Sequence, residues 1–112
     1  GLGEATKKAV AEALVHALEK DEAEQVRAQA AKALKSAYSA AYFVAGLGEA
    51  TKIAVAEALA HALEKDEAEQ VRAQAAKALK SAYSAAYFVA GLGEATKKAV
   101  AEALVHALEK DE

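Results

Sequence analysis

Apolar positions recur at helical spacing through most of the chain. Between residues 22 and 45 lysines and serines occupy one side, and the apolar stripe on the other consists of Val26, Ala30, Ala33, Leu34, Ala37, Ala41 and Val44. Positions three and four apart share a face of an α-helix, so the pattern predicts a helix over about residues 22–45. Asp21, with Glu24 three residues later, is typical of an N-cap and its reciprocal capping partner.

A second amphipathic pattern covers residues 4–20. Its polar side is charged, and its apolar side consists of Val10, Ala13, Leu14, Ala17 and Leu18. Alanines at every fourth position, from Ala5 to Ala17, form a ridge of methyl groups. A ridge this small lets a neighbouring helix approach toward the short end of the ~8–10 Å interaxial range. The pattern therefore predicts a helix with close helical neighbours.

A short stretch with two glycines separates the two patterns. Gly46 stands where a helix ends in a left-handed residue, a conformation that glycine adopts without steric cost. Leu47 is then placed to fold back on the last turn near Tyr42, as in a Schellman ending. Gly48 begins the next helix, and Glu49 places a negative charge at the positive end of that helix. The stretch predicts a corner between two helices.

The whole pattern repeats with a period of 45 residues. Residues 46–90 repeat residues 1–45 with two differences, and residues 91–112 repeat the start of the chain without change. Periods of roughly 20–50 residues are typical of solenoids and related arrays. One hairpin cannot bury such wide apolar sides alone, whereas stacked hairpins cover one another. The sequence predicts one all-α, solenoid-like domain of helical hairpins over 1–112, with two and a half repeats and five helices in the order A-B-A-B-A.

Two positions distinguish the copies. Ile53 stands where the first copy has Lys8, and Ala60 stands where it has Val15. The two positions are two helical turns apart and therefore share one face. A face open to water has no need of isoleucine, so we expect neighbours to cover this face of the middle A helix. The smaller Ala60 is expected to make room for a close contact.

The composition supports an all-α chain and argues against two classes of binding partner. The 112 residues are 54% apolar, mostly alanine, with no proline, cysteine, methionine or tryptophan, and alanine, glutamate, lysine and leucine are strong helix formers. The net charge of −3 is spread along the chain, which argues against nucleic acid and anionic membranes as partners. No apolar run reaches the ~18 residues of a membrane span, and nothing resembles a signal peptide. We expect a soluble chain that expresses in the cytoplasm, while its natural compartment stays open.

Three histidines occupy equivalent positions in the copies. Each follows a glutamate by four residues, in the pairs Glu12–His16, Glu57–His61 and Glu102–His106. Histidine titrates near neutral pH, which suits a metal ligand or a general base. The spacing matches neither Glu-x-x-His nor His-Glu-x-x-His, and equivalent residues on stacked hairpins lie too far apart to share one ion. We therefore interpret the pairs as solvated helix surface.

The remaining candidate groups are serines, glycines and aromatic residues. A serine nucleophile needs a positioned base and an oxyanion hole, and no local motif supplies either to Ser36, Ser39, Ser81 or Ser84. The glycines lack the longer phosphate-binding patterns that follow a strand. Tyr38, Tyr42 and Phe43 are predicted to pack the end of the hairpin, the alternative being a surface for a peptide or a second chain. We expect no catalytic, cofactor or metal site.

One segment of each unit resembles a known family. The string DEAEQVRAQAAKAL at 21–34, which recurs at 66–79, is similar to HEAT-like repeats, particularly the short helical repeats of the phycobilisome-lyase type. The shared features are an acidic cap, a Val-Arg pair and two alanine steps, at Asp21, Val26-Arg27, Ala30-Ala31 and Ala33-Leu34. The helix at 4–20 and the glycine corner depart from that family, and neither turn contains proline.

The near-identity of the copies extends to their surface lysines and glutamates, which drift first after an old duplication. Taken whole, the chain looks like a designed helical-repeat protein. That resemblance implies a structural scaffold that is not an enzyme, has no natural biochemical activity and requires no partner. Two alternatives stay open, a HEAT-like protein–protein interaction module and a building block that associates weakly with itself through an open helical end.

Overall fold

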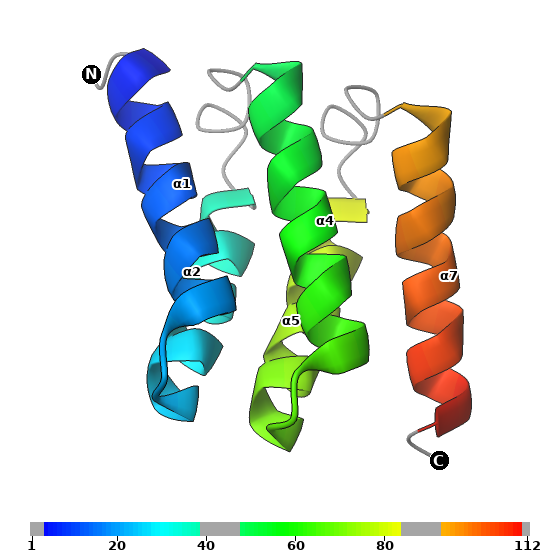
Figure 1. Cartoon of the computed structure of the whole chain (residues 1–112). Helices are drawn as coiled ribbons and strands as arrows, with labels where there is room; N and C mark the ends of the chain where they lie inside the picture. The colour runs from blue at the N-terminus through cyan, green and yellow to red at the C-terminus, as the bar shows by residue number, and fades with distance from the viewer. Residues whose placement is uncertain (1–3, 39–47, 84–92, 111–112) are drawn as a thin grey trace.

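The computed structural model describes residues 4–38, 48–83 and 93–110, and these residues form five α-helices and no strand (Figure 1). The helices are α1 (Glu4–Lys20), α2 (Glu24–Tyr38), α4 (Glu49–Lys65), α5 (Glu69–Tyr83) and α7 (Glu94–Lys110). The all-α prediction is confirmed. The helix predicted over 4–20 has the predicted bounds, and its two copies form α4 and α7.

The prediction that Asp21 is the N-cap of the next helix is wrong. The Asp21 N–H donates to the Ala17 carbonyl at 3.1 Å, so Asp21 ends α1. Its Oδ1 accepts from the Ala23 N–H at 2.9 Å, which closes a tight turn before the helix instead of capping it. The Ala23 carbonyl accepts the first helical hydrogen bond, from the Arg27 N–H at 3.1 Å. Helix α2 therefore begins at Glu24, two residues later than predicted.

Gly48 is the N-cap of α4, which begins at Glu49, directly after the predicted corner. Its backbone is extended, with φ −75° and ψ 166°, and its carbonyl accepts from the Lys52 N–H at 3.1 Å. Gly93 accepts from the Lys97 N–H at 3.0 Å in the same way. The left-handed ending at Gly46, the fold-back of Leu47 and the last part of the predicted 22–45 helix lie outside the described residues.

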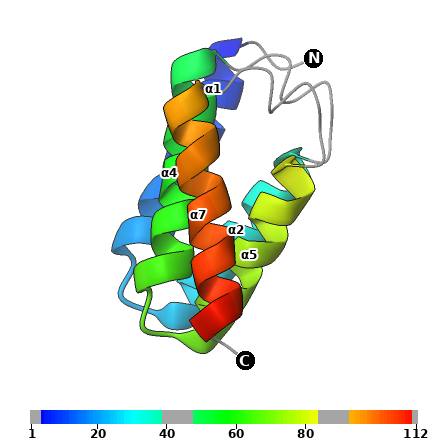
Figure 2. The ribbon, with the colours of Figure 1, turned by 90° about the vertical axis from the view of Figure 1, so that its right-hand side faces the viewer.

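The five helices lie in two layers (Figures 1 and 2). The first layer consists of α1, α4 and α7 side by side, with α4 in contact with both neighbours. In the second layer α2 packs against α1, α5 packs against α4, and α2 and α5 contact each other. Figure 2 shows the layers closest at the end that carries the short turns between α1 and α2 and between α4 and α5.

The core lies between the layers and is centred on α4. Its largest fully buried side chains are Leu18, Leu34, Leu59, Leu79, Val55 and Val71. Most of the other buried apolar residues are alanines, and these let the helix backbones approach closely. Helix α4 contributes most because it has a helix on either side in its own layer and α5 beneath it.

The two positions that distinguish the copies follow this central placement. Ile53 is half-buried and packs against the core, whereas Lys8 and Lys98 at the same position of α1 and α7 are exposed. Ala60 is 8% exposed, whereas Val105 of α7 is 55% exposed. The prediction that neighbours cover this face of the middle A helix is confirmed.

Identical residues of the two copies differ in burial according to their neighbours. Val26 of α2 is 42% exposed, although the sequence pattern places it on the apolar stripe, and its copy Val71 in α5 is fully buried. Ala28 and Ala31 of α2 lie outside the predicted stripe and are buried. The reason is the position of α5, which covers only one side of α2. The apolar stripe of the sequence pattern therefore coincides with the buried side at Val71 but not at Val26.

Candidate functional site

The most elaborate polar arrangement of the described residues joins the two copies. Arg27 on α2 donates from Nε to Asp66 Oδ2 at 2.8 Å and from Nη2 to Asp66 Oδ1 at 3.2 Å. Asp66 ends α4, where its N–H donates to the Ala62 carbonyl at 3.0 Å. The pair is bidentate, which fixes both distance and orientation between α2 and the end of α4.

Arg27 also holds its own turn. Its Nη1 donates to the carbonyl oxygens of Asp21 at 2.9 Å and Glu22 at 3.1 Å. The Arg27 and Asp66 side chains are 12% and 10% exposed. The hydrogen bond that Arg27 donates to Asp66, and after it the negative charges of Asp66, Glu67 and Glu24, raise the pKa of Arg27 against the opposing effect of desolvation. The carboxylate of Asp66 thus favours the charged form of the guanidinium, which an arginine keeps through the neutral and alkaline range.

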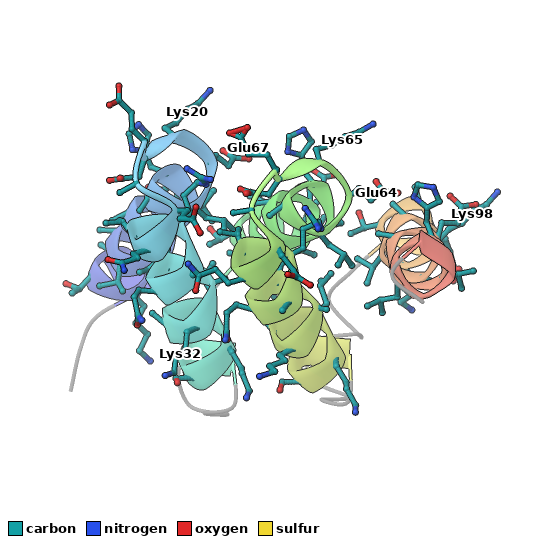
Figure 3. All side chains as sticks on the ribbon, turned by 90° about the horizontal axis from the view of Figure 1, so that it is seen from below. Lys20, Lys32, Glu64, Lys65, Glu67 and Lys98 are labelled. Carbon is teal, nitrogen blue, oxygen red and sulfur yellow. The ribbon has the colours of Figure 1, made fainter. Side chains whose placement is uncertain are left out.

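A cavity of about 290 Å³ surrounds this pair at the end of the molecule that carries the short turns. Its walls also include Glu19 and Leu18 of α1 and His61 and Lys65 of α4. Figure 3, a view onto this end, shows both Lys65 and Glu67 on this end of the molecule. The guanidinium already makes four hydrogen bonds within the chain, so it is occupied in holding helices together and is not available to receive an anion.

Two further polar contacts cross between the copies. Gln70 Nε2 of α5 donates to Glu24 Oε2 of α2 at 2.9 Å. The Glu24 side chain thus accepts a hydrogen bond from the neighbouring helix α5, and it is not the reciprocal capping partner of Asp21 that the sequence predicts. His106 Nδ1 of α7 lies 3.7 Å from Glu64 Oε2 of α4, a pair that is charged only when the histidine is protonated. Figure 3 shows Glu64 on the side of α4 that faces α7.

The three histidines are exposed and do not converge. His16 lines a groove between α1 and α4, His61 lines the cavity beside Arg27, and His106 pairs with Glu64 rather than with Glu102 of its own helix. Within residues 4–38, 48–83 and 93–110, no group of three or more histidine, aspartate or glutamate side chains is arranged to hold a metal ion. Nothing in the described part of the chain gives these histidines a shared ligand.

The other candidates lie on α2 and α5 or outside the described residues. Ser36 is exposed and Ser81 is half-buried, on α2 and α5. Tyr38 and Tyr83 end these two helices. Two of the serines and the rest of the aromatic cluster with its copy lie outside the described residues. The serines are Ser39 and Ser84, and the aromatic residues are Tyr42, Phe43, Tyr87 and Phe88.

Comparison with known proteins yields no relative. No family model, no curated protein and no solved structure matches the chain. None of the helices in the described residues is long and apolar enough to cross a membrane. The function must therefore be argued from the packing itself.

The helical pattern of the sequence does not reveal the Arg27–Asp66 pair. The two residues are 39 positions apart, and a helical pattern read within one unit relates neither to the other. One signal was present, since an arginine in the middle of an alanine-rich segment recurs in each full copy, always six residues after an aspartate. That signal identifies the bond within the turn, which Arg72 repeats from Nη1 to the Asp66 carbonyl at 2.8 Å. The bridge to the next copy appears only once α2 and α4 are placed in space.

Replacing Arg27 by glutamine is expected to lower the midpoint of thermal unfolding by a few degrees. The change removes the bidentate pair and leaves the Asp66 carboxylate with the Ala68 N–H, at 2.9 Å, and water. Arg72→Gln is the matched control, because Arg72 makes the same bond within its turn but has no carboxylate partner among the described residues. Circular dichroism melts of both variants test the expectation, and equal midpoints would contradict it.

Proposed function

We propose that the protein is an engineered structural repeat protein with no natural biochemical activity. Its role is that of a structural scaffold. Each 45-residue unit is a helical hairpin, and successive hairpins stack as a solenoid-like array. The near-identity of the copies at surface positions, where selection for a partner would diversify residues, supports an engineered origin. The resemblance of residues 21–34 to HEAT-like repeats fits an assembly from natural hairpin fragments.

One observation carries the proposal. The face that α4 turns toward α1 and the face that α7 turns toward α4 use the same positions of the unit. These positions are buried in both helices, as Thr51, Val55 and Ala58 in α4 and as Thr96, Val100 and Ala103 in α7. In α1, which has no helix before it among the described residues, Thr6, Val10 and Ala13 at those positions are exposed. The same side chains thus form successive contacts, as a stacked array requires.

The alternative of a HEAT-like interaction module is less well supported. A module of that kind presents a concave or flat face to a partner that is rarely periodic, so residues on the binding face differ from repeat to repeat. Here the copies differ only at two positions, and one of these, Ala60, is buried between helices. Recovery of one stoichiometric partner from a cell lysate would nevertheless favour the module and contradict the scaffold.

Lengthening the chain tests the stacking directly. A variant with one further copy of residues 46–90, inserted after Ala90, is expected to keep the same helical content per residue and to unfold at higher urea concentration. The inserted copy gains one more interface of the kind between α4–α5 and α1–α2. The matched control is the same insertion with aspartate at the positions equivalent to Val55 and Val71, which are fully buried in that interface. An inserted unit that adds no stability, or that unfolds in a separate transition, would contradict the proposal.

A further inference from the structure

The two ends of the array present complementary faces. The entry face lies on the outer side of α1 and α2 and consists of Thr6, Val10, Ala13, Val26 and Ala33. In the second copy the same positions are buried against the first, as Thr51, Val55, Ala58, Val71 and Ala78. Val10 and Val26 are 41% and 42% exposed and are two of the three large apolar side chains that stand out as exposed among the described residues. Among the residues that the structure describes, the entry face thus has no counterpart of the copy that covers these positions in α4 and α5.

The exit face lies at the opposite end, on α4 and α5. On α5 it consists of Ala73, which is exposed, and Ala76, which is half-buried, whereas Ala28 and Ala31 at the same positions of α2 are buried against α5. On α4 it consists of Ala56 and Ala60, and α7 covers this part. The exit face therefore has one half occupied by α7 and one half open.

Helix α7 has the sequence of α1, residue for residue. Helix α7 covers a surface of α4. If a second molecule stacked on this one as the second copy stacks on the first, its α1 would cover the same surface. The α1–α2 hairpin of a second molecule cannot dock on α4 and α5 while α7 is in that place. We propose that α7 is an intramolecular stop, and that its displacement lets a second copy of this chain dock its entry face on the exit face.

Replacing α7 by the α1 of a second molecule leaves the contacts on α4 unchanged, and the α2 of that molecule adds contacts on α5. Because the two sequences are identical, each contact that α7 gives up on α4 is replaced by the same contact from the incoming α1. The added contact is that of the incoming α2 with α5. It brings a second Val26 to α5, where Ala73 is exposed and Ala76 is half-buried. The equivalent Val71, Ala28 and Ala31 are buried in the chain's own α2 and α5, which contact each other. Against this gain stand the entropy of association and the tether that keeps α7 at high effective concentration.

Charge complementarity favours a second copy over another occupant. Within the chain Glu24 of α2 accepts from Gln70, and Arg27 pairs with Asp66. The exit face carries Glu69 and Arg72 at the equivalent positions, and the entry face carries Gln25 and Asp21. The incoming hairpin therefore brings the amide and the carboxylate that these two side chains need. Asp111 follows α7 in the sequence as Asp21 follows α1, and it lies outside the described residues.

The docking is heterologous, since the entry face of one molecule meets the exit face of the next. Heterologous contacts that do not close into a ring generate open chains of molecules. The 112-residue chain is expected to be a monomer at low concentration, because α7 closes the exit face. Loosening α7 is expected to convert it into head-to-tail oligomers. The inference rests on the proposed function, because it extends between molecules the stacking proposed within one.

The test uses the full chain with Val100→Asp, which places a charge on a side chain of α7 that is 2% exposed against α4. The weight-average mass from light scattering is expected to rise with concentration, to several times the 11.6 kDa of one chain. A second substitution in the same chain, Val26→Asp, changes only the entry face and is expected to return the mass to that of a monomer. Val105→Asp is the matched control, because it places the same charge on the exposed outer side of α7 and leaves the contact with α4 intact.

A mixture of two variants tests directly whether the entry face of one chain binds the exit face of another. The doubly substituted chain, Val100→Asp with Val26→Asp, has an accessible exit face and a blocked entry face, whereas the unsubstituted chain has a free entry face and a closed exit face. Each alone is expected to be monomeric, and an equimolar mixture is expected to form a complex of two chains with no larger species. A mixture that stays monomeric would overturn the proposal.

Two other results would also overturn it. One is a Val100→Asp chain that keeps the helical content of α1, α2, α4 and α5 and stays monomeric. The other is association that persists when Val26→Asp is added, which would indicate non-specific aggregation of a loosened chain. If Val100→Asp unfolds the whole chain, the unsubstituted chain and the Val26→Asp variant are compared by light scattering at millimolar concentration. Only the unsubstituted chain is then expected to exceed the mass of a monomer. Equal masses would refute the exchange. If the lengthened chain is stabilised and these tests fail, stacking within the molecule stands and only exchange between molecules is rejected.

Discussion

Replacing Leu59 by alanine is expected to lower the free energy of unfolding by about 3 kcal/mol, because the side chain is fully buried at the centre of α4. Removal of a buried leucine loses its transfer free energy and leaves a cavity that the surroundings fill only in part. The alanine-rich neighbours of Leu59 have short side chains that cannot move far into the space. The loss is therefore expected to fall within the usual range of about 2–5 kcal/mol for such changes.

The chain supplies two controls for this prediction. Leu14 and Leu104 occupy the same position of the unit in α1 and α7, with almost the same flanking sequence, and both are half-buried. Alanine at either position is expected to cost about 1.5 kcal/mol, because less apolar surface is removed from the core. Helix propensity changes equally in all three variants, so the difference between them reports burial alone. Urea unfolding of the three single variants measures it, and equal losses would mean that the middle helix is not more deeply packed than its neighbours.

Replacing Val71 by alanine is expected to lower the free energy of unfolding by about 1.5 kcal/mol. Two buried carbon atoms contribute about 0.8 kcal/mol each, a residual cavity adds to the loss, and the better helix propensity of alanine returns about 0.5 kcal/mol. Val71 is fully buried where α5 meets α2. The effect therefore measures how strongly the second copy packs on the first.

Val26→Ala is the matched control, since Val26 has the same neighbours in sequence and is 42% exposed. Its small loss of contacts and its gain in helix propensity nearly cancel, so the free energy of unfolding is expected to change by less than about 0.5 kcal/mol. Urea unfolding of both variants under one set of conditions gives the comparison. A loss at Val26 as large as that at Val71 would show that α2 is covered on its outer side, for example by a second molecule.

The extent to which the sequence predicts this structure can be traced to particular residues. The helix over 4–20 was predicted at its observed bounds, because a charged side and an apolar side alternate at one clear period and a glycine precedes it. The start of α2 was misplaced, because Asp21 satisfies the Ala23 N–H in the turn and leaves the helix to begin at Glu24. Helix capping and tight turns draw on the same side-chain acceptors, and the sequence does not say which use prevails.

Burial was harder to predict than helix bounds. Val26 and Val71 have identical sequence surroundings and opposite exposure, so no pattern read within a unit can distinguish them. The two positions at which the copies differ gave the better signal, because Ala60 and Ile53 marked the middle A helix as the one with neighbours on both sides. The Arg27–Asp66 pair could not be predicted, because it depends on how one hairpin is placed on the next.

The alanine-rich interior has a consequence for how the fold responds to temperature. Of the twenty buried apolar residues described, twelve are alanines. A methyl group withdraws little hydrocarbon surface from water, so unfolding exposes less of the surface that gives proteins their large heat-capacity increment. With a small increment, the enthalpy and entropy of unfolding drift slowly as the solution is warmed or cooled. The stability curve of such a fold is shallow, so its free energy of unfolding changes little on refrigeration or moderate heating.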